Sequence, residues 1–305
     1  MNKQKRYYFN YINECNMCGS KIDTHKILGK RLNCSQGKNP RGKIGITTTI
    51  LKCTNCGLIY SNPQPVPFDI QDHYGVIPES YWKENYFVID DNYFKYEITR
   101  LKSLIDFKEG MKSLDIGAGL GKQMIALGKI GFDTFGIEPS INFYERAISK
   151  MGIKPEKLIL GQIEKLNFNE NSFDFISFNA VLEHLYDPSG SILKALKWLK
   201  TDGIIYILVP SSDWLIGKII NLFYKLKRTD YVCNLSPMHE PYHLYEFGLK
   251  SFQYHAKRYN YDLAFYEYFV GETYMPKAFN PILVPYMKQT NTGMMMGIWL
   301  KKINI

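Results

Sequence analysis

The sequence has no run of eighteen or more uncharged apolar residues, so it offers no candidate for a membrane-spanning helix. The basic first ten residues are not followed by an apolar stretch of the kind that signal peptides contain. Charged residues make up only 22% of the 305 positions and hydrophobic residues 45%, which excludes a disordered chain. These absences predict a soluble, cytoplasmic protein with one large domain and a small one.

Cysteine is scarce, and four of the six cysteines stand in two Cys-x-x-Cys-Gly segments. This arrangement fits metal binding in a reducing compartment better than a disulfide framework. Two such pairs can close a tetrahedral Zn²⁺ shell, and a fully closed shell is typical of a structural zinc. We therefore expect a zinc ribbon over residues 1–62, with Zn held by Cys15, Cys18, Cys53 and Cys56.

Acidic residues are nearly missing from the first sixty positions. Glu14 and Asp23 stand there against eleven Lys and Arg, a local net charge of 11 − 2 = +9. The other 245 residues balance, with 38 − 11 = 27 bases and 29 − 2 = 27 acids. A basic module beside a neutral one indicates an anionic partner, such as RNA, a nucleotide-sugar diphosphate or a lipid surface. A solvated basic loop is the alternative explanation.

From Lys112 onward, short β-prone runs alternate with helical patterns. Residues 63–110 are expected to be a linker and helical cap, with a helix at 91–107. Residues 111–305 then form the main domain, with an insertion at about 210–250. Alternation of this kind predicts an α/β fold with a parallel sheet and helices on both faces. The expected strands are 112–116, 133–137, 157–160, 173–178, 203–209, 263–269 and 294–301, and the expected helices are 121–130, 140–151, 180–185, 189–200 and 214–228.

A glycine-rich turn, Asp115-Ile-Gly117-Ala-Gly119-Leu-Gly121, follows the first of these strands. Nucleotide cofactors bind at this place in α/β sheets. The dinucleotide template G-x-G-x-x-G fails, because Lys122 stands where its third glycine would be. Glu138 ends the second strand, 21 residues after Gly117, the distance at which an acidic side chain accepts hydrogen bonds from ribose hydroxyls.

The pattern Asp-x-Gly-x-Gly-x-Gly resembles motif I of the class I S-adenosylmethionine (SAM)-dependent methyltransferases, which have a Rossmann-like fold. The likeness continues in order through Gly161–Leu166, Phe173–Pro188 and Leu199–Gly203, and covers roughly residues 80–270. Gln162 stands where an Asp is common in the family. Tyr81 and Tyr86 are placed to cover the cofactor. The resemblance implies SAM as cofactor, with contacts from Asp115, Gly117, Gly119, Gly121, Glu138, Gln162, Ile163 and Asn179.

Methyl transfer to a hydroxyl needs a positioned acceptor and a group that takes its proton. His184, just after the fourth strand, and His243, in the insertion, are the candidate catalytic bases, since a histidine accepts a proton near neutral pH. The alternatives are a packing or cofactor-positioning role for His184 and a lid role for His243, holding Tyr245.

The segment Cys53-Thr-Asn-Cys56-Gly-Leu-Ile-Tyr60-Ser-Asn62-Pro63 resembles the N-terminal module of bacterial methyltransferases tied to surface polysaccharide or modified-sugar synthesis. The resemblance implies a sugar, nucleotide-sugar or glycan-precursor acceptor. Sugar C-methyltransferases are also similar, but Tyr242 replaces the Glu that precedes their histidine, which favours O-methylation. The alternatives are an rRNA or tRNA methyltransferase that binds RNA through the basic ribbon, and a non-enzymatic SAM-sensing or scaffold protein.

The apolar, basic-tailed helix at 214–228 is expected to be a substrate lid, a packed helix or a peripheral membrane contact.

Overall fold

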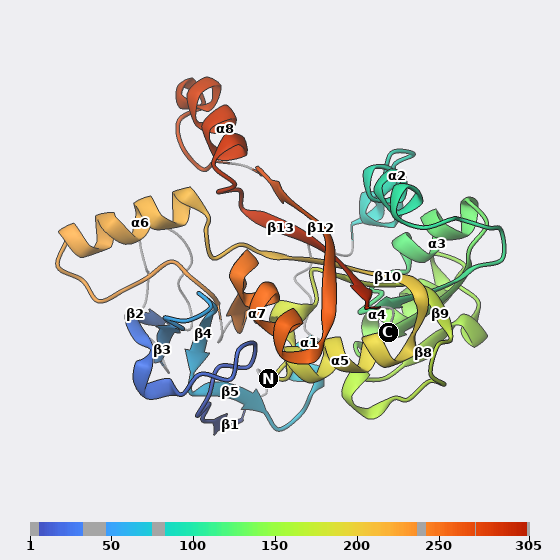
Figure 1. Ribbon diagram of the computed structural model, residues 1–305, viewed down its shortest axis with the longest axis horizontal. Coiled ribbons are helices and arrows are strands. Elements are labelled where there is room, and N and C mark those ends of the chain that lie inside the picture. The colour runs from blue at the N-terminus through green and yellow to red at the C-terminus, as the bar shows by residue number, and fades with distance from the viewer. Residues whose placement is uncertain (1–5, 33–46, 75–82, 237–241, 272, 304–305) are drawn as a thin grey trace.

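A seven-stranded mixed sheet forms the centre of the structure. Figure 1 presents the computed structural model, which describes residues 6–32, 47–74, 83–236, 242–271 and 273–303. The strand order is β12-β13-β10-β9-β6-β7-β8. Strands β6 to β10 run parallel, and β13 pairs antiparallel with β10 and β12. The expected strands after residue 110 are all confirmed, as β6 (Lys112–Ile116), β7 (Asp133–Glu138), β8 (Leu158–Leu160), β9 (Phe173–Asn179), β10 (Leu199–Pro210), β12 (Tyr261–Phe269) and β13 (Met295–Lys302).

Side chains of the central strands alternate between two cores, as they must in a sheet covered on both faces. In β9, Ile176 and Phe178 enter the larger core, whereas Phe175 enters the second core together with Trp299 of β13. Helices α5 and α7 contribute to the larger core, α2 and α3 to the second, and α4 to a third beside β8. Their bounds are α2 Lys95–Leu104, α3 Lys122–Lys129, α4 Ile141–Ser149, α5 Pro188–Trp198 and α7 Leu249–Tyr259.

The N-terminal part is built from two small sheets that extend beyond the expected boundary at residue 62. A two-stranded sheet pairs β1 with β5, which lies after that boundary, and a four-stranded sheet has the order β11-β4-β3-β2. Strand β11 comes from the insertion, so the two units share a sheet. The extended, proline-containing segment expected as a linker is itself the edge strand β5. The bounds are β1 Tyr7–Asn10, β2 Lys26–Leu32, β3 Thr47–Lys52, β4 Ile59–Asn62, β5 Gln64–Pro67, α1 Gln71–Tyr74 and β11 Tyr245–Glu246.

Two helices stand away from the central sheet (Figure 1). Helix α6 (Leu215–Leu226) confirms the expected helix in the insertion, and α8 (Asn280–Gln289) lies at the end of the β12–β13 pair. Helix α6 buries Ile216 and Ile220 but leaves Leu226 75% exposed. Within the described residues, no helix has both the length and the apolar character needed to cross a bilayer.

Three local differences separate the structure from the expectations. The helix expected at 180–185 is a single 3₁₀ turn, η6 (Leu182–His184), because Ala180 takes a positive φ of 57° that breaks helical continuity. Helices α7 and α8 were not predicted; α8 carries Pro285 in its interior, which obscures its pattern. The segment between β2 and β3, residues 33–46, lies outside the described residues.

Candidate functional site

A cavity of about 460 Å³ lies along the carboxyl edge of the sheet. Residues at the ends of β6, β7, β8, β9 and β10 line it, together with Tyr242 and His243 of the insertion. The chain proceeds from β6 outward through β7 and β8 and then returns to β9 on the other side, so the strand order reverses here. Ligands of open α/β sheets bind at such a reversal point. The cavity has the volume of a small-molecule site.

The glycine-rich turn forms one wall of this cavity. Gly117 and Gly119 line it, with φ values of 71° and 55° that favour glycine. A Cβ atom on Gly117 would lie 2.5 Å from Val181, whereas one on Gly119 would meet nothing within 4 Å. Gly121 is not a wall residue: it precedes α3, and a Cβ there would collide with Ile153. The backbone at Gly119 therefore leaves room for a ligand to approach closely.

Glu138 is buried at the end of β7 and lines the cavity. Its carboxylate accepts hydrogen bonds from the backbone N–H groups of Gly119, at 2.7 Å, and Ser140, at 2.8 Å. These bonds tie β7 to the glycine-rich turn and fix the direction of the carboxylate. Burial raises the pKa of Glu138 to about 7. Each carboxylate oxygen keeps a further lone pair, so the group can accept from a ligand hydroxyl.

Gln162 and Ile163, at the end of β8, also line the cavity as expected. The 3₁₀ turn Ile163–Lys165 is held by the Lys194 ammonium of α5, which donates to the carbonyls of Ile163, at 3.0 Å, and Glu164, at 2.9 Å. Together with Glu138, these residues make the β7–β8 end of the cavity.

Asp115 and Asn179 belong to a buried network and are not among the described residues lining the cavity. The hydroxyl of Ser177 donates to Asp115 at 2.9 Å, and the Gln123 amide donates to Ser177. Asn179 in turn donates to Gln123 at 3.1 Å. Burial is the main cause that raises the pKa of Asp115 to about 7. In this structure both residues lie beneath the glycine-rich turn and support it, because the network connects β6, β9 and α3. Sequence reasoning missed Ser177 and Gln123.

His184 and His243 meet at the β9–β10 end of the cavity, with ring centroids 4.8 Å apart. His184 Nδ1 lies 3.0 Å from the carbonyl oxygen of Tyr242. A carbonyl only accepts, so Nδ1 carries the proton and Nε2 keeps its lone pair. Burial lowers the pKa of His184 to about 4, which keeps the ring neutral at pH 7.

Glu183 and three aromatic residues complete this end, and sequence reasoning did not single out Glu183. Its side chain is 1% exposed, and burial raises its pKa to about 8. His73 of α1 stacks on Tyr242, with ring centroids 5.2 Å apart, and both line the cavity. Tyr86 lines it as expected, whereas Tyr81 lies outside the described residues.

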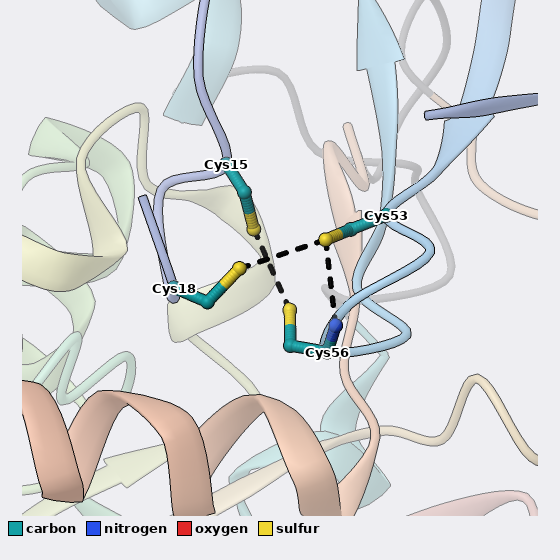
Figure 2. Close-up of side chains that lie close together, drawn as sticks. All are labelled: Cys15, Cys18, Cys53 and Cys56. Atoms are coloured by element: carbon teal, nitrogen blue, oxygen red, sulfur yellow. Dashed lines mark hydrogen bonds between the residues drawn. The ribbon is translucent and has the colours of Figure 1, made fainter. Parts of the chain in front are cut away.

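The four cysteine side chains converge, as Figure 2 shows, and none of them lines the cavity. Cys15 and Cys18 follow β1, and Cys53 and Cys56 lie in the turn between β3 and β4. The sulfur atoms are 3.5 Å apart in the pair Cys15–Cys56 and 3.6 Å apart in the pair Cys18–Cys53. Sulfurs that share one tetrahedral zinc lie about 3.8 Å apart, because each Zn–S bond is about 2.3 Å. The geometry therefore suits one tetrahedral ion and not disulfides, whose S–S bond is about 2.05 Å.

A second, open groove of about 820 Å³ lies between the turn that carries Cys53 and Cys56 and the start of α7. Its lining includes four lysines and one aspartate: Lys26, Lys52, Lys218, Lys250 and Asp213. The cavity has the opposite character, with three glutamates and no lysine or arginine among the described residues that line it. Ser212 lines the groove and Pro210 lines the cavity, so the two linings include residues that are close in the sequence.

A family described as "Methyltransferase domain" matches residues 91–264. Phosphoethanolamine N-methyltransferase 3 of Arabidopsis thaliana is 28% identical over 37% of this chain and 25% of its own length. Demethylmenaquinone methyltransferase of Bacillus mycoides is 27% identical over 37% of this chain and 51% of its own length. The chain spans between a quarter and about half of these two relatives. Among solved structures, the PH0226 protein of Pyrococcus horikoshii is 16% identical, with a TM-score of 0.48 over 75% of this chain and all of that one.

The raised pKa of Asp115 predicts how the stability of the ligand-free protein depends on pH. Its folded pKa of about 7 lies above the ordinary value of 3.8, so the folded state holds the proton more tightly. Its contribution is fully present below about pH 4 and is lost as pH rises through 7, by at most about 1.4 kcal/mol per pH unit. In urea unfolding between pH 5 and 8, Asp115→Asn should remove this part of the slope. The exposed Asp106→Asn is the control, and identical slopes for Asp115→Asn and wild type would contradict the prediction.

Proposed function

The chain belongs to the methyltransferase domain family, and on that premise we propose that it transfers a methyl group from SAM to a hydroxyl of a sugar or glycan precursor. The observation that carries the proposal is the cavity bounded at one end by the glycine-rich turn and Glu138 and at the other by two histidines. The first end suits a nucleoside cofactor, and the second suits an acceptor that must lose a proton.

The residues at the β7–β8 end fit SAM. Glu138 would accept hydrogen bonds from the ribose hydroxyls, and Gln162 and Ile163 would flank the adenine. The open backbone at Gly119 would admit the methionyl part. Three glutamates line the cavity and, among the described residues, no lysine or arginine does, which favours a cationic ligand such as a sulfonium. When bound, SAM supplies a methyl group on a good leaving group.

The acceptor end is proposed to activate a hydroxyl through His184 and His243, in the simplest form by accepting its proton. His184 presents the lone pair of Nε2, because its Nδ1–H is committed to the carbonyl of Tyr242. The oxygen must lie in line with the bond that breaks, and the walls formed by His73 and Tyr242 would orient it.

The lysine groove supports an acceptor that carries phosphates. A polyanion is disfavoured inside a cavity lined by glutamates, whereas four lysines line the separate groove. A nucleotide-sugar or phosphate-linked glycan precursor can place its sugar in the cavity and its phosphates over the groove. The related proteins named above act on phosphoethanolamine and demethylmenaquinone, so family membership alone selects no acceptor.

RNA is the second candidate acceptor, favoured by the same groove and by the net charge of +9 on residues 1–60. It is ranked second because the cavity lacks a basic lining for a phosphate backbone. C-methylation of a sugar is ranked lower still, because Tyr242 stands beside His243 where those enzymes have a glutamate. A peripheral membrane contact through α6 would suit a lipid-linked precursor, since Leu222 and Leu226 are exposed beside Lys225 and Lys227.

We further propose that the four cysteines bind one structural zinc. The support is the set of sulfur separations in Figure 2, together with the short loops that carry them. A zinc there would fix the turn between β3 and β4, and through β4 the insertion strand β11.

Mass spectrometry of cells with and without this chain tests the acceptor. Nucleotide-sugar, glycan and RNA fractions are compared for the loss of one CH₂ group per molecule. We expect the loss in a sugar-containing fraction and none in RNA. A loss confined to RNA would replace the sugar by RNA as acceptor.

Glu138→Ala tests the cofactor end. Two hydrogen bonds from ribose hydroxyls to a carboxylate are lost, each contributing about 1.5–3 kcal/mol, so SAM affinity should fall at least about 100-fold. Isothermal titration calorimetry measures the affinity, and a thermal unfolding scan confirms that the variant is folded. The exposed Glu145→Ala on α4 is the control and should bind SAM like wild type. An unchanged affinity in Glu138→Ala would remove Glu138 from the cofactor site.

Cys53→Ser tests the zinc. Elemental analysis of protein purified under reducing conditions should find one zinc per wild-type chain and little in Cys53→Ser, because a hydroxyl replaces one thiolate of a closed site. Cys233→Ser, which lies beside α6 and outside the cluster, should keep its zinc. If the wild-type chain still contains no zinc after incubation with Zn²⁺, the proposed zinc site is rejected.

A further inference from the structure

We propose that Glu183, His184 and His243 form a binding site for a divalent first-row transition-metal ion at the acceptor end of the cavity. One ligand atom from each of the three lies within 4.8 Å of the others, and all three residues line the cavity. Glu183 and His184 come from the turn η6 after β9, and His243 comes from the insertion. This site is separate from the cysteine cluster, which holds no histidine or carboxylate.

Glu183 carries the strongest sign that a ligand belongs here. Its side chain is 1% exposed, and its Oε2 atom has no hydrogen-bond partner. Buried carboxylate oxygens are almost always paired, because removing them from water without a partner is costly. A cation in the cavity would supply the missing partner. Oε1 of the same carboxylate lies 4.0 Å from His184 Nε2, so both face a common point.

His184 is already oriented as a metal ligand. Its Nδ1–H donates to the backbone carbonyl of Tyr242, which leaves Nε2 unprotonated. Histidines that bind metals almost always donate their other ring N–H to a carbonyl or carboxylate in this way, because the bond fixes the tautomer and the ring direction.

The backbone holds the third ligand against the other two. Leu244 is the residue that follows His243, and its N–H donates to the carbonyl of Glu183 at 2.8 Å. Ser236 and His243 form an antiparallel bridge, with Ser236 N–H donating to the His243 carbonyl at 3.2 Å. The insertion is therefore hydrogen-bonded to η6 directly beside His243. Ligands of one ion with bonds of about 2.1 Å lie at most about 4.2 Å apart, so a side-chain adjustment of under about 1 Å closes the site.

The donor set selects the class of ion. Two imidazoles and one carboxylate suit Zn²⁺, Fe²⁺ or a similar ion, whereas Mg²⁺ prefers oxygen ligands throughout. Three protein ligands also leave coordination positions open on the cavity side, which is the arrangement of a catalytic and not a structural metal. The open positions would accept an oxygen of the acceptor, or two oxygens on neighbouring carbons.

This inference rests on the proposed hydroxyl methylation and gives it a mechanism. A cation that binds the hydroxyl oxygen lowers its pKa, as it does for bound water. The O–H bond breaks and the proton passes to solvent. The oxygen then forms the new O–CH₃ bond as the CH₃–S bond breaks, and the bonding pair stays on sulfur as a neutral thioether. The two histidines then act as ligands, in place of the direct proton transfer considered above.

Binding of Mn²⁺ to the full, zinc-loaded chain tests the site. Mn²⁺ is the probe because thiolate sites disfavour it, and because its free-ion electron paramagnetic resonance signal disappears on binding. Wild type should bind one Mn²⁺ ion, and Glu183→Gln and His243→Gln should each weaken this binding at least tenfold. Glu164→Gln is the matched control, a glutamate in the same cavity but outside the cluster, and should bind like wild type. Co²⁺ should give the same ranking of variants, with absorption bands that lack thiolate charge transfer.

The proposal is overturned if wild type binds neither ion, or if Glu183→Gln binds them as tightly as wild type does. SAM affinity, measured in parallel, separates this outcome from a failure of the proposed function. Glu183→Gln should keep SAM affinity within about threefold of wild type, because Glu183 lies at the other end of the cavity from Glu138. A chain that binds Mn²⁺ but not SAM would reject the methyltransferase function and leave the metal site standing.

Discussion

Backbone pairing of the short segment Leu244–Glu246 is the constraint on which the candidate site depends. On one side, β11 pairs with β4 of the N-terminal sheet, and Ser61 N–H donates to the Leu244 carbonyl at 3.2 Å. On the other side, Leu244 N–H donates to the carbonyl of Glu183. The segment thereby connects the cysteine-bearing sheet to the turn that follows β9. Because His243 directly precedes this segment, its position relative to Glu183 and His184 is set by strand pairing and not by a flexible loop.

The cavity and the lysine-lined groove carry side chains of opposite charge. The cavity presents carboxylates and the neutral imidazole of His184, which suit cations, whereas the groove beside the second cysteine pair presents four lysines. The groove is lined by residues from the N-terminal module, the start of α6 and the start of α7. The proposed acceptor, with a neutral reacting end and an anionic tail, would match both surfaces better than a uniformly charged polymer. The excess of basic residues in the first sixty positions supplies one side of this groove through Lys26 and Lys52.

Sequence patterns predicted the parts of the structure that local chemistry determines. The strands β6 to β10 are short β-prone runs, and the glycines at 117 and 119 take the positive φ angles that their turn requires. The parts that were missed depend on partners far away in the chain. Asp115 accepts a hydrogen bond from Ser177, which in turn accepts one from Gln123, and sequence spacing does not reveal either contact. The pairing of Gln64–Pro67 with Tyr7–Asn10 crosses the predicted boundary at residue 62, and sequence reasoning overlooked Glu183 beside the more conspicuous His184.

The small size of the N-terminal module gives its contacts with the main domain weight. Units of about sixty residues bury a small fraction of their surface and are only marginally stable on their own. Here Cys15 and Cys56 pack in the same core as Phe247 and Phe252, and Ser251 donates to the carbonyl of Cys56 at 3.3 Å. Distortion of the cysteine cluster would therefore be transmitted through β4 to β11, and so to the acceptor end of the cavity. The β7–β8 end of the cavity has hydrogen bonds of its own, from Gly119 and Ser140 to Glu138, and a further small core lies beside β8, although Ile116 and Ile137 share the larger core. On the proposed function, the N-terminal module would therefore influence the placement of the acceptor, and the parallel sheet would hold the cofactor.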